Sequence, residues 1–172
     1  DEYVSKIQPK VSDKWRTDEL YLKMKGNKTY LFSVMDDETR FWIAQQVAPH
    51  KGVSNIRPLF REATQISGKI PKTIISDGAF NFGMAIRDEF SDPKTKPNHI
   101  AEIRMNGKVH NNKMERMNGE LRDREKVMRS LKREDTPILK GLQIYHNFIR
   151  EHMALGNQTP AERAGIKVEG QN

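Results

Sequence analysis

The chain has 172 residues, and its 30 Lys and Arg against 23 Asp and Glu give a formal net charge of +7 at pH 7. It contains no cysteine, which excludes disulfide frameworks, thiol nucleophiles and cysteine-based zinc sites. No stretch approaches the roughly 18 consecutive apolar residues that a membrane span needs, so an integral membrane protein is excluded. We therefore expect a soluble, intracellular protein of one domain whose partner is a polyanion.

The amino end of the chain is predicted to be a short lead-in. The first residue is Asp1 rather than Met, which indicates a piece excised from a longer chain. Residues 1–14 are polar apart from a few spaced apolar side chains. We expect a lead-in segment over residues 1–14 and a single domain over residues 15–172.

Three strands joined by short turns are predicted next. Residues 15–23 alternate loosely and contain Trp, Thr, Leu and Tyr, which favour a strand. A turn at Gly26 and Asn27 precedes a more buried strand over residues 28–36. An acidic turn then leads into a third strand over residues 41–47. Short turns between consecutive strands predict an antiparallel meander.

The hydrophobic period changes after the third strand. Apolar residues recur at helical spacing over residues 53–66, and Gly68 ends that segment. A β-branched strand over residues 70–76, a short helix over 79–90 and a fifth strand over 98–105 follow. The order β-β-β-α-β-α-β, with a further helix after it, predicts an α/β fold in which helices flank a mixed five-stranded sheet.

The remaining third of the chain is predicted to be helical. Residues 112–133 contain no proline and a single glycine, which favours one long helix. Thr136 and Pro137 are an N-cap and first-turn proline for a second helix that ends near residue 151. Residues 159–162 form a capping-box pattern that opens a last short helix. We expect these extra C-terminal helices to pack on the domain.

Three acidic residues have positions that suit chemistry. Asp18 lies inside the first predicted strand, Asp77 follows the end of the strand over 70–76, and Glu115 lies in the first turn of the long helix. An acid within a strand of core-type residues is costly unless it is paired or bound to a metal. Ligands of open α/β folds usually bind at strand ends. The three acids could therefore converge as oxygen ligands for two Mg²⁺ or Mn²⁺ ions.

Each of these acids also has an ordinary structural interpretation. Asp77 with its following glycine could be a plain turn. Glu115 could be a carboxylate that faces the positive end of the helix dipole. Asp18 could be a surface residue of an edge strand.

The order of these motifs resembles the catalytic core of DDE transposases and retroviral-type integrases, which has a ribonuclease-H-like fold. The resemblance covers Trp15 to Gly165 and is closest to insertion-sequence transposases of bacteria and archaea. Asp77 and Glu115 are separated by 37 residues, near the spacing usual in the family. The resemblance is carried by WRTDELYLKMKGNKTYLFSVMDDETRF, IISDG, NNKMERMNGELRDR and LGNQTPAERAGI.

The resemblance implies a catalytic triad and an activity. Asp18, Asp77 and Glu115 match the family's metal-binding acids, with two Mg²⁺ or Mn²⁺ ions as cofactors. The implied activity is cleavage of transposon ends and strand transfer into target DNA. The implied partners are DNA and further copies of the chain in a dimer or larger assembly, and the implied location is the cytoplasm of a prokaryote, on the nucleoid.

Other acids near the first two strands are alternatives to the triad. Asp36 competes with Asp18 as the first acid, but it falls at the end of the second strand, where the family often has a non-catalytic Asp. Asp37 and Glu38 are interpreted as ordinary turn residues. Because neighbouring side chains of a strand point to opposite faces, we expect Glu19 to point away from the site that Asp18 faces.

The long helix is predicted to contact DNA. On a wheel of about 100° per residue, four basic residues align with Glu115 in a ridge, while Met and Leu side chains form a separate core stripe. Between residues 104 and 133 there are 10 Lys and Arg against 4 acids, so this segment holds +6 of the +7 charge. The alternative is a solvated helix face. The predicted DNA contacts are Arg122, Lys126, Arg129, Arg133, Asn118, Arg116, Lys113 and His110.

Two other functions remain open from the sequence. A ribonuclease-H-like nuclease would share the metal site but only hydrolyse nucleic acid. A catalytically inactive, domesticated DNA-binding module would keep the basic helix without turnover. The complete set of Asp18, Asp77 and Glu115 argues against the second.

Overall fold

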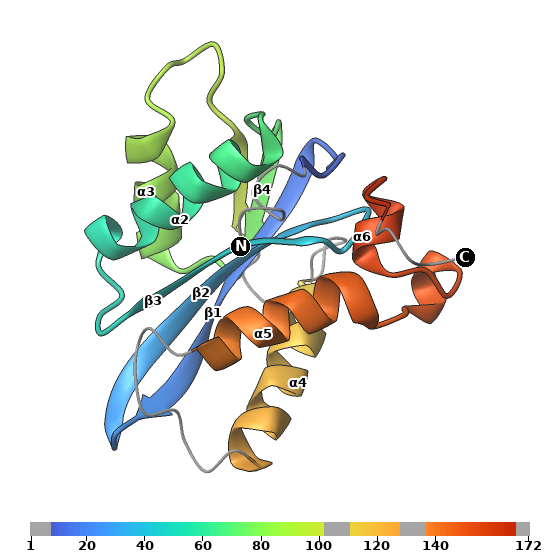
Figure 1. Cartoon of the computed structure of the whole chain (residues 1–172). Helices are drawn as coiled ribbons and strands as arrows, with labels where there is room; N and C mark the ends of the chain where they lie inside the picture. Colours follow the sequence, from blue (N-terminus) through green and yellow to red (C-terminus); the bar gives the residue numbers. More distant parts are fainter. Residues whose placement is uncertain (1–7, 102–110, 128–136, 168–172) are drawn as a thin grey trace.

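The structure is a computed structural model that describes residues 8–101, 111–127 and 137–167 (Figure 1). The last residues of the predicted fifth strand, 102–105, and the last residues of the predicted long helix, 128–133, lie outside these ranges. Among the described residues, no helix is both long enough and apolar enough to cross a membrane.

One mixed sheet of five strands forms the centre of the domain, in the order β3-β2-β1-β4-β5. The first three strands are an antiparallel meander, and the last two run parallel to β1. This arrangement confirms the predicted α/β fold with a mixed sheet. The strands are β1 (Lys14–Met24), β2 (Asn27–Asp36), β3 (Trp42–Ala48), β4 (Thr73–Ser76) and β5 (Asn98–Ala101).

The first hairpin turns one residue earlier than predicted. Met24 pairs with Asn27, so the two turn residues are Lys25 and Gly26, and both have positive φ angles of 49° and 80°. Two consecutive positive φ angles match the twist of a two-residue hairpin, and glycine adopts such an angle without steric cost. Asn27 therefore opens β2 rather than ending the turn.

Helices cover both faces of the sheet (Figure 1). On one face, α2 (Val53–Ser67) and α3 (Phe80–Glu89) bury large side chains such as Phe60 and Phe82 against Phe32 of β2. On the other face, α4 (Asn112–Val127) and α5 (Pro137–Ile144) enclose a second core. That core contains Leu20, Leu22, Met24, Leu31, Met35, Trp42, Met114, Met117, Leu121 and Leu139.

Burial confirms the described part of the predicted core stripe of the long helix, and its other two members, Met128 and Leu131, lie outside the described residues. Met114, Met117 and Leu121 of α4 are buried against β1 and β2. The helix predicted to run to residue 151 changes after α5 into a π-helical turn, η1 (Tyr145–Ile149), and then ends. The 3-10 turn η2 (Met153–Leu155) leads to α6 (Pro160–Arg163), which opens with the predicted capping box of Thr159 and Glu162.

The segment before β1 is joined to the rest of the domain by its backbone. The amide of Lys10 donates to the carbonyl of Ala164 at 2.9 Å. The carbonyl of Asp13 accepts from the amides of Lys72 and Thr73 at 2.8 and 3.0 Å. Residues 10–13 therefore connect the region of α6 to the start of β4.

Candidate active site

Asp18 lies on β1 where that strand passes the end of β4. In the parallel pair, Arg16 is opposite Ile75, so Asp18 comes level with Asp77, the residue that follows β4. The Asp18 Oδ1 atom accepts from the amide of Glu19 at 2.9 Å, and Oδ2 accepts from Nδ2 of Asn118 on α4 at 2.8 Å. The structure thus brings together two of the predicted triad acids from separate strands.

Glu19 joins these two acids, contrary to our prediction that it would point away. One carboxylate oxygen from each of Asp18, Glu19 and Asp77 lies within 4.8 Å of the other two. The alternation of the strand itself holds, because Asp18 contacts Asn118 of α4 whereas Glu19 contacts Lys51, just before α2 on the opposite face. Since β4 ends at Ser76, the neighbouring strand does not separate the two faces here, and the long Glu19 side chain reaches the same place.

The surroundings of Asp18 raise the pKa of its carboxyl group. Burial and the charge of Asp77 together raise the pKa of Asp18 from 3.8 to about 7. Glu19 has one oxygen paired with the Lys51 ammonium, and its other oxygen, Oε2, is buried without a hydrogen-bond partner among the described residues. The three carboxylates therefore have more hydrogen-bond acceptor atoms and negative charge than the described donors and the Lys51 ammonium balance.

The loop that carries Asp77 is fixed by backbone and side-chain hydrogen bonds. The Asp77 Oδ1 atom accepts from the amide of Ala79 at 3.0 Å, and Gly78 adopts a φ of 85°. The buried Ser76 hydroxyl accepts from the Gly78 amide at 3.3 Å and lies 2.8 Å from Nε2 of His99 on β5. Burial lowers the pKa of His99 and so favours its neutral ring. The sequence offered no signal for this role of His99.

Glu115, the third acid of the predicted triad, is not a member of this group. Its side chain is exposed on α4. Two asparagines on the same edge of the helix contact β1: Asn111, four residues earlier, has its Nδ2 atom 3.4 Å from the Thr17 carbonyl, and Asn118, three residues later, binds Asp18. Because residues three and four apart share a helix face, Glu115 lies on the edge of α4 that adjoins β1.

Asp36 and Asp37 have structural surroundings of different kinds. Asp36 is buried, and its carboxylate accepts hydrogen bonds from the amide and hydroxyl groups of Ser12 and of Thr39. Asp37 lies in the turn after β2, as interpreted from the sequence, and its carboxylate also pairs with Arg16 of β1 and with Lys113 of α4. Asp37 therefore ties the start of α4 to the sheet.

The predicted DNA contacts have different surroundings. Arg116, Arg122 and Lys126 are exposed on α4, and Lys126 lies 3.3 Å from Asp123. The Lys113 ammonium contacts Asp37 at 2.7 Å, and Asn118 is buried against Asp18 rather than open to solvent. Three predicted contacts lie outside the described part of the chain: His110, Arg129 and Arg133.

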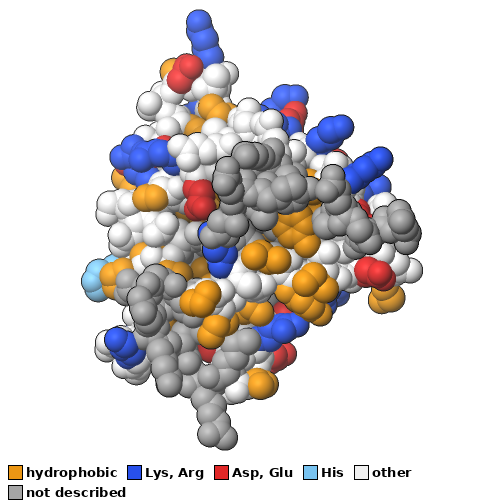
Figure 2. Space-filling model, in the orientation of Figure 1, with side chains coloured by type: hydrophobic (Ala, Val, Ile, Leu, Met, Phe, Trp, Pro, Cys, Tyr) orange, Lys and Arg blue, Asp and Glu red, His pale blue; other side chains and the backbone are white. Residues whose placement is uncertain are grey.

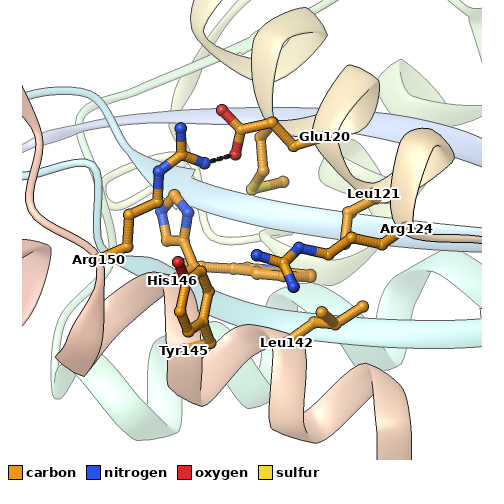
Figure 3. A pocket seen from close by; sticks show the side chains of 9 residues that line it. Glu120, Leu121, Arg124, Leu142, Tyr145, His146 and Arg150 are labelled. Carbon is orange, nitrogen blue, oxygen red and sulfur yellow. Dashed lines mark ion pairs between the residues drawn. The ribbon is translucent and has the colours of Figure 1, made fainter. Parts of the chain in front are cut away.

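A pocket lies between α4, α5 and η1 (Figure 3), and its lining on α4 does not include Glu115. Glu120 forms an ion pair with Arg150 across it, and the Arg124 guanidinium lies 4.5 Å from the centroid of the Tyr145 ring. The side chains of Leu121 and Leu142 contribute apolar lining. These contacts attach the C-terminal helices to the helix that carries Glu115.

Comparison with known proteins agrees with this geometry. A family model described as "DDE domain" matches residues 12–152. The chain is similar in fold to the HTLV-2 integrase catalytic core domain solved with magnesium in a dimeric form, with a TM-score of 0.65 and 14% identity over 92% of this chain and 97% of that one. No curated protein matches the chain.

Two further structures share the fold. The trimeric form of the same HTLV-2 domain has a TM-score of 0.64 and 20% identity, with 92% of this chain and 98% of that chain covered. A chain of the simian T-cell lymphotropic virus intasome, solved with the PP2A regulatory subunit B56 gamma, has a TM-score of 0.67 and 13% identity, over 96% of this chain and 59% of that chain. At these identities the likeness establishes the ribonuclease-H-like fold of integrase catalytic cores.

Proposed function

Because the chain belongs to the DDE domain family, we propose that it is the catalytic core of a DNA transposase that cleaves transposon ends and joins them to target DNA. The observation that carries the proposal is the meeting of Asp18 and Asp77 at the end of β4, with Asn118 of α4 bound to Asp18. A plain turn at Asp77 or a surface role for Asp18 would not require this convergence. The reaction is phosphoryl transfer to water or to a 3′-hydroxyl.

The donor set at this place fits hard divalent cations. Carboxylate oxygens are the ligands that Mg²⁺ and Mn²⁺ prefer, and Glu19 Oε2 is buried without a protein partner among the described residues. We propose Asp18, Asp77 and Glu115 as the residues that hold two such ions, with Glu19 as the alternative third acid. The chemistry supplied by ions bound there is activation of the attacking oxygen and stabilisation of the leaving 3′ oxygen.

The residues of the chain position the reacting groups. Asn118 donates to Asp18 Oδ2 and so fixes the rotamer of a carboxyl group that must face Asp77. The Ser76 hydroxyl supports the backbone turn that presents Asp77. Lys51 neutralises one oxygen of Glu19 and reduces the repulsion among the three acids. Together they hold the acids in place before a substrate arrives, which lowers the reorganisation that the reaction needs.

The exposed basic residues of α4 are the proposed contacts to the DNA backbone beside these acids. Arg122 lies seven residues after Glu115, two helical turns along the same edge of α4. Arg116 directly follows Glu115 in the sequence. Cations that displace counterions from phosphates supply affinity that falls with salt. The proposed partners are transposon ends, target DNA and further copies of this chain, and the proposed setting is the nucleoid in the cytoplasm of a prokaryote.

The test is joining of a labelled oligonucleotide, taken from an end of the element that encodes the chain, to a plasmid in Mg²⁺ or Mn²⁺. We expect Asp18→Asn, Asp77→Asn and Glu115→Gln each to reduce joining by roughly 1000-fold or more, because each removes a metal ligand. Glu38→Gln is the matched control, since Glu38 is an exposed acid of the turn after β2. The DNA affinity of every variant is measured alongside.

Each other outcome changes a defined part of the proposal. Unchanged joining by all three variants would show that the triad is wrong. Loss of joining in Glu19→Gln but not in Glu115→Gln would make Glu19 the third ligand. Hydrolysis of the oligonucleotide without any joined product would favour the nuclease alternative. Tight DNA binding without any turnover would favour the inactive DNA-binding module.

A further inference from the structure

A groove with four lysines lies at the other end of β4 from the carboxylates. It is formed by the end of α2, the segment that leads into β4 and the loop before β5. Among the residues that the structure describes, no acidic side chain lines it. Its lining residues are Thr64, Gly68, Lys69, Ile70, Pro71, Lys72, Lys94, Thr95 and Lys96.

One wall of the groove is fixed by a shared carboxylate. Lys69 Nζ lies 2.7 Å from Asp13 Oδ1, and Lys72 Nζ lies 2.6 Å from Asp13 Oδ2. Asp13 in turn is held by its backbone, because its carbonyl accepts from the amide of Lys72 at 2.8 Å. Two ammonium groups are thus brought to one place by a single acid, which leaves a net charge of +1 on this wall.

The other wall is a tight turn with two exposed lysines. The amides of Thr95 and Lys96 both donate to the Asp92 carbonyl, at 3.1 and 2.9 Å. Asp92 Oδ1 accepts from the amide of Lys94 at 2.9 Å, which closes the turn. With Asp13 and Asp92 counted, the two walls have a net charge of +2. Figure 2 shows Lys and Arg side chains along the upper edge of the molecule, where the loop between α3 and β5 lies in Figure 1.

The groove is separate from the carboxylate group. Lys72 precedes β4 and Asp77 follows it, so the two lie at opposite ends of the strand. Five steps along a strand correspond to about 16 Å. Lys94 and Lys96 precede β5, which runs parallel to β4, and they therefore lie at the same end as Lys72. Contacts here do not require the acids at the other end.

We propose that this groove binds the phosphate backbone of DNA, at a stretch of DNA other than the one held at the carboxylates, without reading its sequence. Lysine is a compact charge that suits phosphate, and the hydroxyl group of Thr95 is a further phosphate donor. The described lining contains no Arg, Asn or Gln, the side chains that read base edges in pairs of hydrogen bonds.

The apolar lining of the groove argues against an acidic protein as the occupant. Protein interfaces rely on central aromatic or large apolar anchors that fill pockets. Ile70 is the large apolar side chain of this lining, and it is only 37% exposed. Charge without an anchor favours a polyanion whose affinity comes from its phosphates.

The test measures binding of the chain to a fluorescent 30-base-pair DNA of unrelated sequence over a range of salt concentrations. We expect Lys94→Gln with Lys96→Gln to weaken binding about tenfold or more, and to reduce the slope of log K against log salt by about 2, since each lost phosphate contact contributes about 0.9. The control is Arg163→Gln with Lys167→Gln, two exposed basic residues at α6 with the same change of charge.

A second measurement separates the groove from the proposed catalytic site. With Mg²⁺ and DNA from an element end, we expect the groove variant to raise KM while kcat stays unchanged. Equal loss of affinity in the groove variant and the control would show an effect of net charge alone and would overturn the proposal. Unchanged DNA affinity with lost binding to polyglutamate would overturn it in favour of an acidic protein. If the chain had no turnover, the proposed function would fail while the binding measurement still decided the groove.

Discussion

Asp36 at the end of β2 and Asp18 on the neighbouring strand β1 are both largely buried, and their surroundings differ. The carboxylate of Asp36 accepts four hydrogen bonds, from Ser12 and Thr39, each through its amide and its hydroxyl. The carboxylate of Asp18 accepts two and lies within 4.8 Å of oxygens from two other acids. One acid is satisfied by the protein, and the other is placed among like charges.

The two acids differ in what their surroundings do for a negative charge. The four donors satisfy the hydrogen-bonding capacity of the buried Asp36 carboxylate, so the protein needs no external cation there. The carboxyl group of Asp18 has fewer donors, and burial and the charge of Asp77 raise its pKa to about 7. A buried acid whose environment disfavours its charge is stable as a carboxylate only when a cation binds, which is the condition that a metal site meets.

The largest expected effect on stability is that of Asp36→Ala. The change leaves the amide and hydroxyl of Thr39 in the buried turn, and those of Ser12 before β1, without their acceptor, so we expect the free energy of unfolding to fall by roughly 3 kcal/mol. Denaturation with urea measures it, and Glu38→Ala, two residues later on the surface, is the control, with a change below about 0.5 kcal/mol. A loss for Asp36→Ala no larger than that of the control would mean that its four hydrogen bonds contribute nothing to folding.

For Asp18→Asn in the absence of divalent metal, we expect the free energy of unfolding to rise rather than fall. The folded-state pKa of Asp18, about 7, is above its unfolded value of 3.8. The protonated carboxyl of Asp18 therefore contributes its whole stabilisation of the folded state below about pH 4. This contribution is lost as the pH rises through 7 and the group ionises. At pH 8 with a chelator, the Asn variant should be more stable than the parent chain by a few kcal/mol, and at pH 4 the two should be equal.

The same urea titration at the two pH values checks this expectation. Asp36→Asn serves as the matched control, because it makes the same chemical change at the acid that has four donors. It should destabilise the chain at pH 8. If Asp18→Asn also destabilised the chain at pH 8, the group of three acids would not be strained in the absence of metal.

A third expectation concerns the pH dependence of metal binding. Because the proton on Asp18 must leave before its oxygens bind a cation, Mn²⁺ affinity should rise with pH up to about 7, by at most tenfold per pH unit, and then level off. Calorimetric titration in two buffers of different ionisation enthalpy should report about one proton released per binding event at pH 6. Affinity that stays constant between pH 5.5 and 7.5 would contradict the raised pKa of Asp18.

The smallest expected effect is that of Asn118→Ala. Its amide stabilises the charged form of Asp18 through one hydrogen bond, so its loss should raise the pKa of Asp18 further and weaken Mn²⁺ binding at pH 7 by a few-fold. Gly119→Ala is the control, since an added Cβ there meets nothing within 4 Å. Equal Mn²⁺ affinity for the two variants would show that Asn118 does not help to position Asp18 for metal binding.

Much of this fold follows from local pattern. Alternating and β-branched segments predicted the strands, and the short turn at Gly26 predicted the hairpin, although its position was off by one residue. The meeting of Asp18 and Asp77 followed from their positions relative to strands, because a parallel sheet aligns its strand ends.

The missed contacts depend on tertiary structure that local pattern does not contain. Glu19 reaches Asp77 only because β4 is short and ends at Ser76, and the length of a neighbouring strand is not written in the residues around Glu19. Asp37 pairs with Lys113, which is 76 residues away in the sequence. His99 contacts Ser76 because β5 pairs with β4, and which strands pair is set by the topology of the whole sheet.

The position of β1 in the sheet has a consequence for how such chains can change in evolution. This strand pairs with β2 on one edge and with β4 on the other, so its register aligns Asp18 with Asp77 and also places Leu20 in the core beneath α4. One residue inserted before Asp18 would exchange the two faces and send every following side chain to the wrong side. We therefore expect β1 to tolerate substitution far better than any change of length, whereas insertions should accumulate in the exposed turn at Lys25 and Gly26.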